Sequence, residues 1–218
     1  MGITNWQKSK DFLNAIGVNA IDVPKDIFQS LKEIGLKSKT VKYNKNLVGH
    51  IKEEYEILNY TPDIKNFIEK QVSANPVYAN INRKYNANKH SSPIVLDRIW
   101  INFQNKYEFN PLHDHSGCAS FIIFVNIPYN LEDEENYFAE TNPNADIYTS
   151  KLCFLNMFND GSFMHKPLDV DKSFEGKMLM FRNDQYHCVY PFYTSDDKRI
   201  TIAGNLCFNN ENYNIQRS

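Results

Sequence analysis

The hydrophobic pattern after residue 91 constrains the fold of this chain most strongly. Apolar side chains there recur with a period of two, and polar loops rich in turn-forming residues separate the runs. No helical pattern lies between the runs, and consecutive strands without connecting helices form antiparallel sheets. We expect strands at Ile94–Phe103, Ser120–Ile127, Lys151–Met157, Lys177–Phe181 and Arg199–Phe208. The pattern therefore predicts a sandwich, barrel or jelly roll.

The first ninety residues show helical periodicity instead. Pro24 opens a segment with one apolar face, and Gly35 follows it as the expected residue after the helix end. A second stretch places apolar residues at helical spacing from Leu47 to Leu58, and a third begins with the cap sequence Thr61-Pro62-Asp63. We expect these helices to pack on the outside of one sheet, with the Asn- and Lys-rich segment 80–90 as the connection to it.

The fold class expected is therefore α+β. At 218 residues the chain suits a single domain, with a helical part over 1–92 and a β-rich core over 93–210. The acidic stretch Leu131–Glu135 is interpreted as a solvated turn.

Composition narrows the partners and the compartment. The net charge is −2 and no basic block is present, which disfavours a nucleic-acid partner. No run approaches the roughly 20 apolar residues that a membrane span needs, and the first residues lack the apolar core of a signal peptide. The four cysteines form no C-x-x-C pair, so we expect a reduced, cytoplasmic protein. Because the charge pattern disfavours nucleic acid, we expect the substrate to be a small molecule or a side chain. The sequence sets no oligomeric state.

Three histidines form the candidate metal site. His113 and His115 are two residues apart, and in an extended strand such side chains point to the same face, while Asp114 points away. His187, from a distant strand, would supply a third nitrogen. Three ligands on one side of an octahedral ion leave positions open for substrate and dioxygen, which favours catalysis over a structural role.

The last expected strand carries a candidate anion site. Ile200, Ile202, Leu206 and Phe208 occupy one face, so Arg199 and Thr201 share the other with Ala203 and Asn205. A guanidinium binds a carboxylate through two parallel hydrogen bonds, and a neighbouring hydroxyl adds another. An anionic co-substrate such as a dicarboxylate fits this pair.

Six segments resemble, in order, the core of the 2-oxoglutarate and Fe(II)-dependent dioxygenases. They cover about residues 94 to 208, and they look closest to short oxygenases with an H-x-H first motif. The resemblance implies a double-stranded β-helix (jelly-roll) core, Fe(II) held by the first motif and His187, and 2-oxoglutarate held by Arg199 and Thr201, with dioxygen as the oxidant; Asn102 would line the same pocket. The segments are Trp100-Ile-Asn102, His113-Asp-His115, Ser120–Pro128, Gly176–Phe181, His187–Pro191 and Arg199–Asn205.

The first motif departs from the usual H-x-D of that superfamily. Asp114 cannot take the place of His115 on a regular strand, because it faces the opposite side; only a bulge would turn it inward. Three neutral imidazoles also raise the charge of the site by one relative to two histidines and a carboxylate, so the outcome of the oxidation is less constrained than the metal.

Other interpretations stay open. The cysteines next to candidate ligands, Cys118 and Cys188, allow a closed structural zinc site. A cupin-like three-histidine enzyme would work without 2-oxoglutarate, and a jelly-roll protein could bind without catalysis. Arg199 could instead form a structural ion pair. The remaining histidines, His50, His90 and His165, are interpreted as ordinary helix, loop and surface residues.

Overall fold

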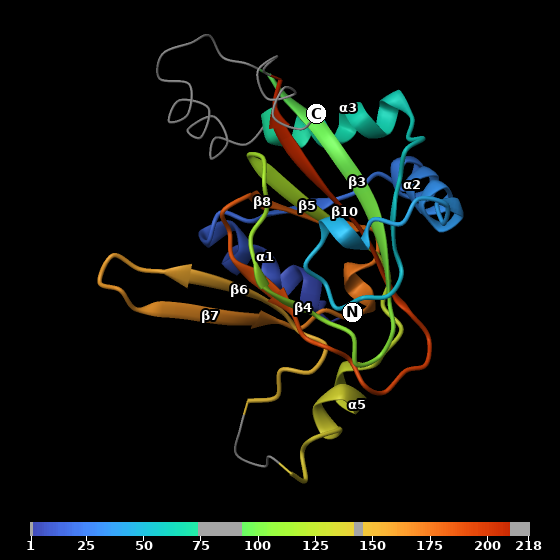
Figure 1. Ribbon diagram of the computed structural model, residues 1–218. Coiled ribbons are helices and arrows are strands. Elements are labelled where there is room, and N and C mark those ends of the chain that lie inside the picture. The colour runs from blue at the N-terminus through green and yellow to red at the C-terminus, as the bar shows by residue number, and fades with distance from the viewer. Residues whose placement is uncertain (1, 74–92, 142–145, 210–218) are drawn as a thin grey trace.

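The computed structural model describes residues 2–73, 93–141 and 146–209. Within them lie two antiparallel sheets (Figure 1). The larger sheet has the order β1 (Asn19–Asp22), β8 (Lys177–Arg182), β5 (Ala119–Asn126), β10 (Arg199–Phe208), β3 (Ile94–Gln104) and β2 (Glu54–Glu56). The smaller sheet has the order β4 (Asn110–His113), β9 (His187–Val189), β6 (Leu152–Met157) and β7 (Phe163–Leu168).

Helices lie around the larger sheet (Figure 1). They are α1 (Asn5–Ala15), α2 (Lys25–Lys37), α3 (Pro62–Ser73) and the short α5 (Leu131–Asn136), with 3₁₀ turns at Asn44–Asn46 and Lys172–Phe174. This mixed α+β arrangement of antiparallel sheets is consistent with a jelly-roll core.

The two faces of the larger sheet pack into different cores, because successive side chains of a strand alternate. On β8, Met178 and Met180 join the outer core with α2 and α3, which contribute Leu31 and Ile64. The alternate residues Leu179 and Phe181 join the inner core together with Leu152 and Phe154 of the smaller sheet, the side that α1 also reaches. The space between the sheets is therefore apolar at one end, which leaves the other end for a cavity.

The five strands predicted from the sequence are present as β3, β5, β6, β8 and β10, with bounds that differ by one residue at most. The predicted faces of β10 are confirmed: Ile202 and Leu206 lie in the outer core, whereas Arg199 and Thr201 face the space between the sheets. Strands β1 and β7 were not predicted, and β4 and β9 were expected only as extended segments around the histidines, because three to six residues with polar members give no clear alternation. The predicted connection 80–90 lies outside the described residues.

The predicted helix from Leu47 to Leu58 is wrong. The chain runs extended there and forms β2, which adds to the edge of β3. Ile57 is fully buried while Leu58 is 58% exposed, so the apparent helical stripe is not the buried one. Gly49 explains part of the local path, since a Cβ at this position would lie 2.3 Å from the Asn110 side-chain oxygen.

Two further interpretations need correction. Gly35 lies inside α2 rather than after it, because a Cβ there would crowd Ile101 and Ile202 at 3.0 Å as the helix packs on the sheet. The acidic stretch is the helix α5, capped by the Asn130 side chain, and Glu134 within it is fully buried and accepts hydrogen bonds from the backbone of the 193–194 turn. A buried carboxylate needs such partners.

Helix α1 was not predicted from the sequence, although it begins with an N-terminal capping motif. Thr4 and Gln7 form a capping box, in which each side chain bonds the backbone of the other. Its buried residues Trp6 and Leu13 belong to the inner core. The polar sequence between them hides the apolar stripe.

Candidate metal centre and adjoining pocket

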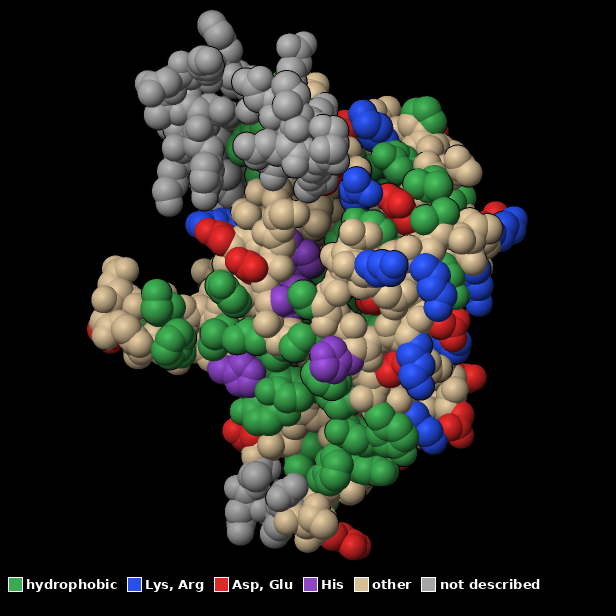
Figure 2. Space-filling model, in the orientation of Figure 1, with side chains coloured by type: hydrophobic (Ala, Val, Ile, Leu, Met, Phe, Trp, Pro, Cys, Tyr) green, Lys and Arg blue, Asp and Glu red, His purple; other side chains and the backbone are tan. Residues whose placement is uncertain are grey.

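A cavity of about 480 Å³ opens between the two sheets. Histidine side chains reach the surface near the middle of this face, beside the projecting hairpin of β6 and β7 (Figure 2). The large sheet contributes residues from β2, β3 and β10, and the small sheet contributes the ends of β4 and β9. Every residue predicted for the site lines this cavity, namely Asn102, His113, His115, His187, Arg199 and Thr201.

Three histidines meet at one end of the cavity. His113 ends β4 and lies directly opposite His187 of β9, with ring centroids 4.3 Å apart. The His115 ring centroid lies 5.0 Å from that of His113 and 5.1 Å from that of His187. One nitrogen from each ring lies within 4.8 Å of the other two, so these side chains can hold one metal ion.

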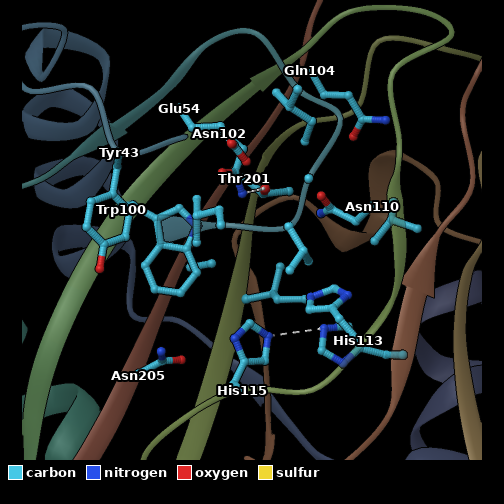
Figure 3. Close-up of a pocket in the computed structure, with 18 of the residues that line it drawn as sticks. Tyr43, Glu54, Trp100, Asn102, Gln104, Asn110, His113, His115, Thr201 and Asn205 are labelled. Atoms are coloured by element: carbon cyan, nitrogen blue, oxygen red, sulfur yellow. Dashed lines mark hydrogen bonds between the residues drawn. The ribbon is translucent and has the colours of Figure 1, made fainter. Parts of the chain in front are cut away.

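His115 reaches the site by a different route from the one the sequence suggested. The expectation that His113 and His115 lie on one regular strand is wrong, because strand β4 ends at His113. Instead the backbone of His115 is held against Asn183, whose carbonyl accepts from the His115 amide at 2.9 Å and whose side chain donates back at 3.3 Å. The loop thereby turns the His115 ring toward His187, as the dashed line in Figure 3 shows.

Backbone hydrogen bonds orient two of the imidazoles for metal binding. The Nδ1 of His113 donates to the Pro111 carbonyl at 2.7 Å, and the Nδ1 of His187 donates to the Gln185 carbonyl at 2.9 Å. A neutral imidazole with a protonated Nδ1 presents an unprotonated Nε2, and such carbonyl partners are typical of metal-binding histidines.

The spacing of the donor atoms also fits a metal ion. The Nε2 atoms of His115 and His187 lie 3.3 Å apart. Two imidazole nitrogens on adjacent positions of one divalent ion would lie about 3 Å apart, given metal–nitrogen bonds of about 2.1 Å. The spacing of His115 and His187 therefore fits a bound ion, and His113 lies within reach of the same ion.

Burial keeps these rings uncharged. Burial and, to a smaller extent, the neighbouring His113 lower the pKa of His115 to about 3. Burial lowers the pKa of His187 well below its usual range, and it lowers the pKa of His113 as well. Neutral imidazole is the form that binds metal, so the environment favours the ligand form at neutral pH.

Asp114 lies apart from this group. It is exposed at the rim of the cavity, and the cluster of potential ligand atoms does not include it. His115 thus points inward and Asp114 outward, as expected from the sequence. Their roles as ligands stay predictions.

Arg199 lies deeper in the same cavity and is 3% exposed. Its Nε and Nη2 donate to the Gln104 side-chain oxygen at 2.9 and 2.7 Å. The remaining N–H groups donate to the carbonyls of Ser150 and Tyr190 and to the Tyr129 hydroxyl. None of these acceptors is a carboxylate, so a buried positive charge stands without an opposite charge among its bonded partners. An incoming anion would supply that charge.

Thr201 and Asn102 form a polar pair in the cavity (Figure 3), and Thr201 lies two residues after Arg199 on the same strand. They are cross-strand partners on β10 and β3, and the Asn102 amide donates to the Thr201 hydroxyl oxygen at 3.2 Å. The Thr201 hydroxyl hydrogen is therefore available to a ligand. The Asn102 side-chain oxygen is buried without a hydrogen-bond partner, and such an atom favours a donor from a bound molecule.

Two features of the cavity wall were not found from the sequence. Trp100 lies 6.2 Å from His115 between ring centroids and 5.7 Å from Tyr43 on its other side. Glu54 of β2 is 1% exposed, and burial together with the nearby Glu108 carboxylate raises its pKa to about 8. Trp100 shares the cavity face of β3 with Asn102, so strand alternation could have indicated it. Glu54 could not be found in advance, because its place depends on β2 pairing with β3.

The zinc site suggested by the cysteines next to the histidines does not form. Cys118 is buried and its thiol donates to the Leu206 carbonyl. Cys188 follows His187 on β9, where neighbouring side chains point to opposite faces. The interpretation of Arg199 as a structural ion pair also fails, because the groups that accept its hydrogen bonds are uncharged.

Solved structures share this fold. One is an oxidoreductase of the 2OG-Fe(II) oxygenase family from Burkholderia pseudomallei, with a TM-score of 0.51 and 10% identity over 95% of this chain and 90% of that chain. Another is a Pseudomonas putida prolyl-4-hydroxylase, with a TM-score of 0.50 and 11% identity over 94% of this chain and all of that chain. The chain resembles the 2OG-Fe(II) oxygenases in fold. Its sequence matches no family model and no curated protein.

The described helices include none long and apolar enough to cross a membrane.

Proposed function

We propose that the protein is a non-haem Fe(II) and 2-oxoglutarate-dependent oxygenase of hydroxylase type. The observation that carries the proposal is the presence of two complementary groups in one cavity. A cluster of three neutral imidazoles lies at one end, and the buried guanidinium of Arg199 lies deeper in the same space. The fold shared with known oxygenases supports this reading.

In this proposal His113, His115 and His187 hold the iron. Bound Fe(II) supplies the redox chemistry with dioxygen that couples substrate oxidation to decarboxylation of 2-oxoglutarate. The protein keeps the imidazoles unprotonated by burial and fixes two of them through carbonyl hydrogen bonds. These restraints reduce the reorganisation needed when the ion binds.

Arg199 and Thr201 hold the far carboxylate of 2-oxoglutarate. The charge of Arg199 attracts the carboxylate, and the Thr201 hydroxyl donates to it while Asn102 fixes that hydroxyl. Binding at two separate ends orders the co-substrate, so that the keto-acid end lies at the histidines. The substrate, a small molecule or a side chain, would share this cavity, whose wall includes Trp100.

Co-substrate turnover tests the proposal. Purified protein with Fe(II), ascorbate and dioxygen should convert 2-oxoglutarate to succinate and carbon dioxide, slowly without substrate. His187→Ala should lose bound Fe(II) and this turnover, because removing one of three ligands leaves too few donors. His50→Ala is the matched control, since His50 lies in an isolated bridge with Phe109 away from the cluster. Metal retained at wild-type stoichiometry in His187→Ala would contradict the ligand set.

A second candidate is a three-histidine metal enzyme that does not use 2-oxoglutarate. The observation in its favour is that the N–H groups of Arg199 already have protein acceptors, so a carboxylate must replace at least one of them. Stoichiometric metal binding without any succinate formation would favour this candidate. Absence of metal binding would instead favour a non-catalytic binding protein.

A further inference from the structure

A second group of metal-binding side chains lies on the far side of β9 from the three histidines. Strand β9 directs His187 into the cavity and Cys188 to the opposite face. Cys188 is paired directly with Cys153 of β6 across the sheet. On β6, the neighbours Leu152 and Phe154 belong to the inner core, so Cys153 shares the outer face with Cys188.

His165 of β7 completes this group. Cys153 is opposite Pro167, and His165 lies two residues further along β7, which places it diagonally on the same face. Diagonal neighbours of this kind are within reach of long side chains. One ligand atom each from Cys153, His165 and Cys188 lies within 4.8 Å of the others.

The surroundings suit a partly sheltered ion. Cys153 is 1% exposed, Cys188 is half-buried and His165 is exposed, so one side of the group opens to solvent. The ring of Tyr148 lies 5.2 Å from that of His165 and 5.4 Å from that of Tyr190. The group lies at the base of the β6–β7 hairpin, which extends away from the body of the protein (Figure 1).

A disulfide fits this position less well than a metal. The flanking pairs are hydrogen-bonded, from the Leu155 amide to the Tyr186 carbonyl and from the Tyr190 amide to the Lys151 carbonyl, each at 2.9 Å. Cys153 and Cys188 therefore occupy a hydrogen-bonded pair, where Cβ atoms lie at the longer end of roughly 4.5 to 5.5 Å. A disulfide requires roughly 3.5 to 4.5 Å. Both residues are thiols in the structure.

We propose that Cys153, Cys188 and His165 bind one zinc(II) ion. Two thiolates and an imidazole are ligands that zinc prefers, and the open side leaves the fourth tetrahedral position for water. Binding releases the two thiol protons to solvent. The ion would join β6, β7 and β9, and so fix the base of the hairpin to the strand that carries His187. This site is independent of the function proposed above.

Cobalt(II) titration distinguishes this site from the three histidines. Thiolate ligands give Co(II) a strong near-ultraviolet charge-transfer absorbance, which imidazoles alone do not give. Reduced, metal-free protein should develop this absorbance with Co(II) and lose it with Zn(II). His187→Ala should retain the absorbance, and Cys188→Ser should lose it. Cys207→Ser is the matched control, because Cys207 is also half-buried but lies on β10.

His165→Ala should keep the absorbance at saturating Co(II), because both thiolates remain, but weaken Co(II) binding about tenfold or more. Alkylation mapped by mass spectrometry gives a measurement that needs no variant: Zn(II) should protect Cys153 and Cys188 and leave the reaction of Cys207 unchanged. A wild-type Co(II) spectrum without the thiolate absorbance overturns the proposal. So does equal alkylation of Cys153 and Cys188 with and without Zn(II).

Discussion

Glu54→Gln should remove a loss of folding stability that the wild type undergoes as pH rises from 4.5 toward 8. Glu54 lies in the cavity wall on β2, opposite Asn102, and its carboxyl accepts one side-chain hydrogen bond, from Asn44 at 3.1 Å. Burial and the Glu108 carboxylate raise its pKa to about 8 from a usual value of 4.5. The folded protein therefore holds a proton there that the unfolded chain releases above its own lower pKa.

The sign and the size of the effect follow from this difference. Stability from Glu54 is fully present below the unfolded pKa, declines as pH rises from 4.5 toward 8, and is lost above the folded pKa. A difference of 3.5 pKa units, from 8 minus 4.5, corresponds to at most about 5 kcal/mol. Glutamine has the shape of the protonated acid and no charge, so the variant should match the wild type near pH 4.5 and exceed its stability by several kcal/mol at pH 9.

Urea unfolding from pH 4.5 to 9 measures this directly. The free energy of unfolding of the wild type should fall relative to Glu54→Gln across the window, with the urea slope unchanged. Glu108→Gln tests the cause, because removing the second carboxylate should move the upper end of the decline to lower pH while the burial effect remains. Parallel curves for the wild type and Glu54→Gln would refute the reasoning.

The remaining predictions concern the pocket. Arg199→Met should weaken 2-oxoglutarate binding about tenfold or more, because a charge-assisted contact contributes roughly 1.5 to 3 kcal/mol. Gln104→Leu is the control for structural damage, because it removes two hydrogen bonds of Arg199 but keeps its charge. Equal losses of affinity for the two variants in anaerobic calorimetry would exclude a direct role for Arg199. Thr201→Val should weaken the same binding about threefold to tenfold, and an unchanged affinity would remove its hydroxyl from the site. Asp114→Ala should keep the metal, whereas His115→Ala should lose it; the reverse result would make Asp114 the ligand.

The sequence predicted the parts of the site that depend on strand periodicity. The long alternating run of β10 placed Arg199 and Thr201 on one face, and both side chains line the cavity. His113 and His187 were grouped from their motif order, although their direct pairing across β4 and β9 was not foreseen.

The features of the site that could not be predicted depend on contacts between segments that are distant in the sequence. The hold of Asn183 on the His115 loop and the backbone carbonyl of Ser150 at Arg199 come from loops, whose paths no periodicity describes. The helix predicted over 47–58 failed for a related reason: pairing of β2 with β3 competes with local helical preference and wins. That same pairing brings Glu54 into the cavity.

The two tryptophans of this chain provide an optical reporter of the cavity. Trp100 lines the cavity beside His115, whereas Trp6 is buried in the inner core against Phe174, at 5.2 Å between ring centroids. Only one of the two indoles therefore experiences a change when the cavity fills. In Trp6→Phe protein the intrinsic fluorescence would come from Trp100 alone, and a paramagnetic ion at the histidines would quench it. Metal and ligand occupancy can thus be followed in real time, without a label and without turnover.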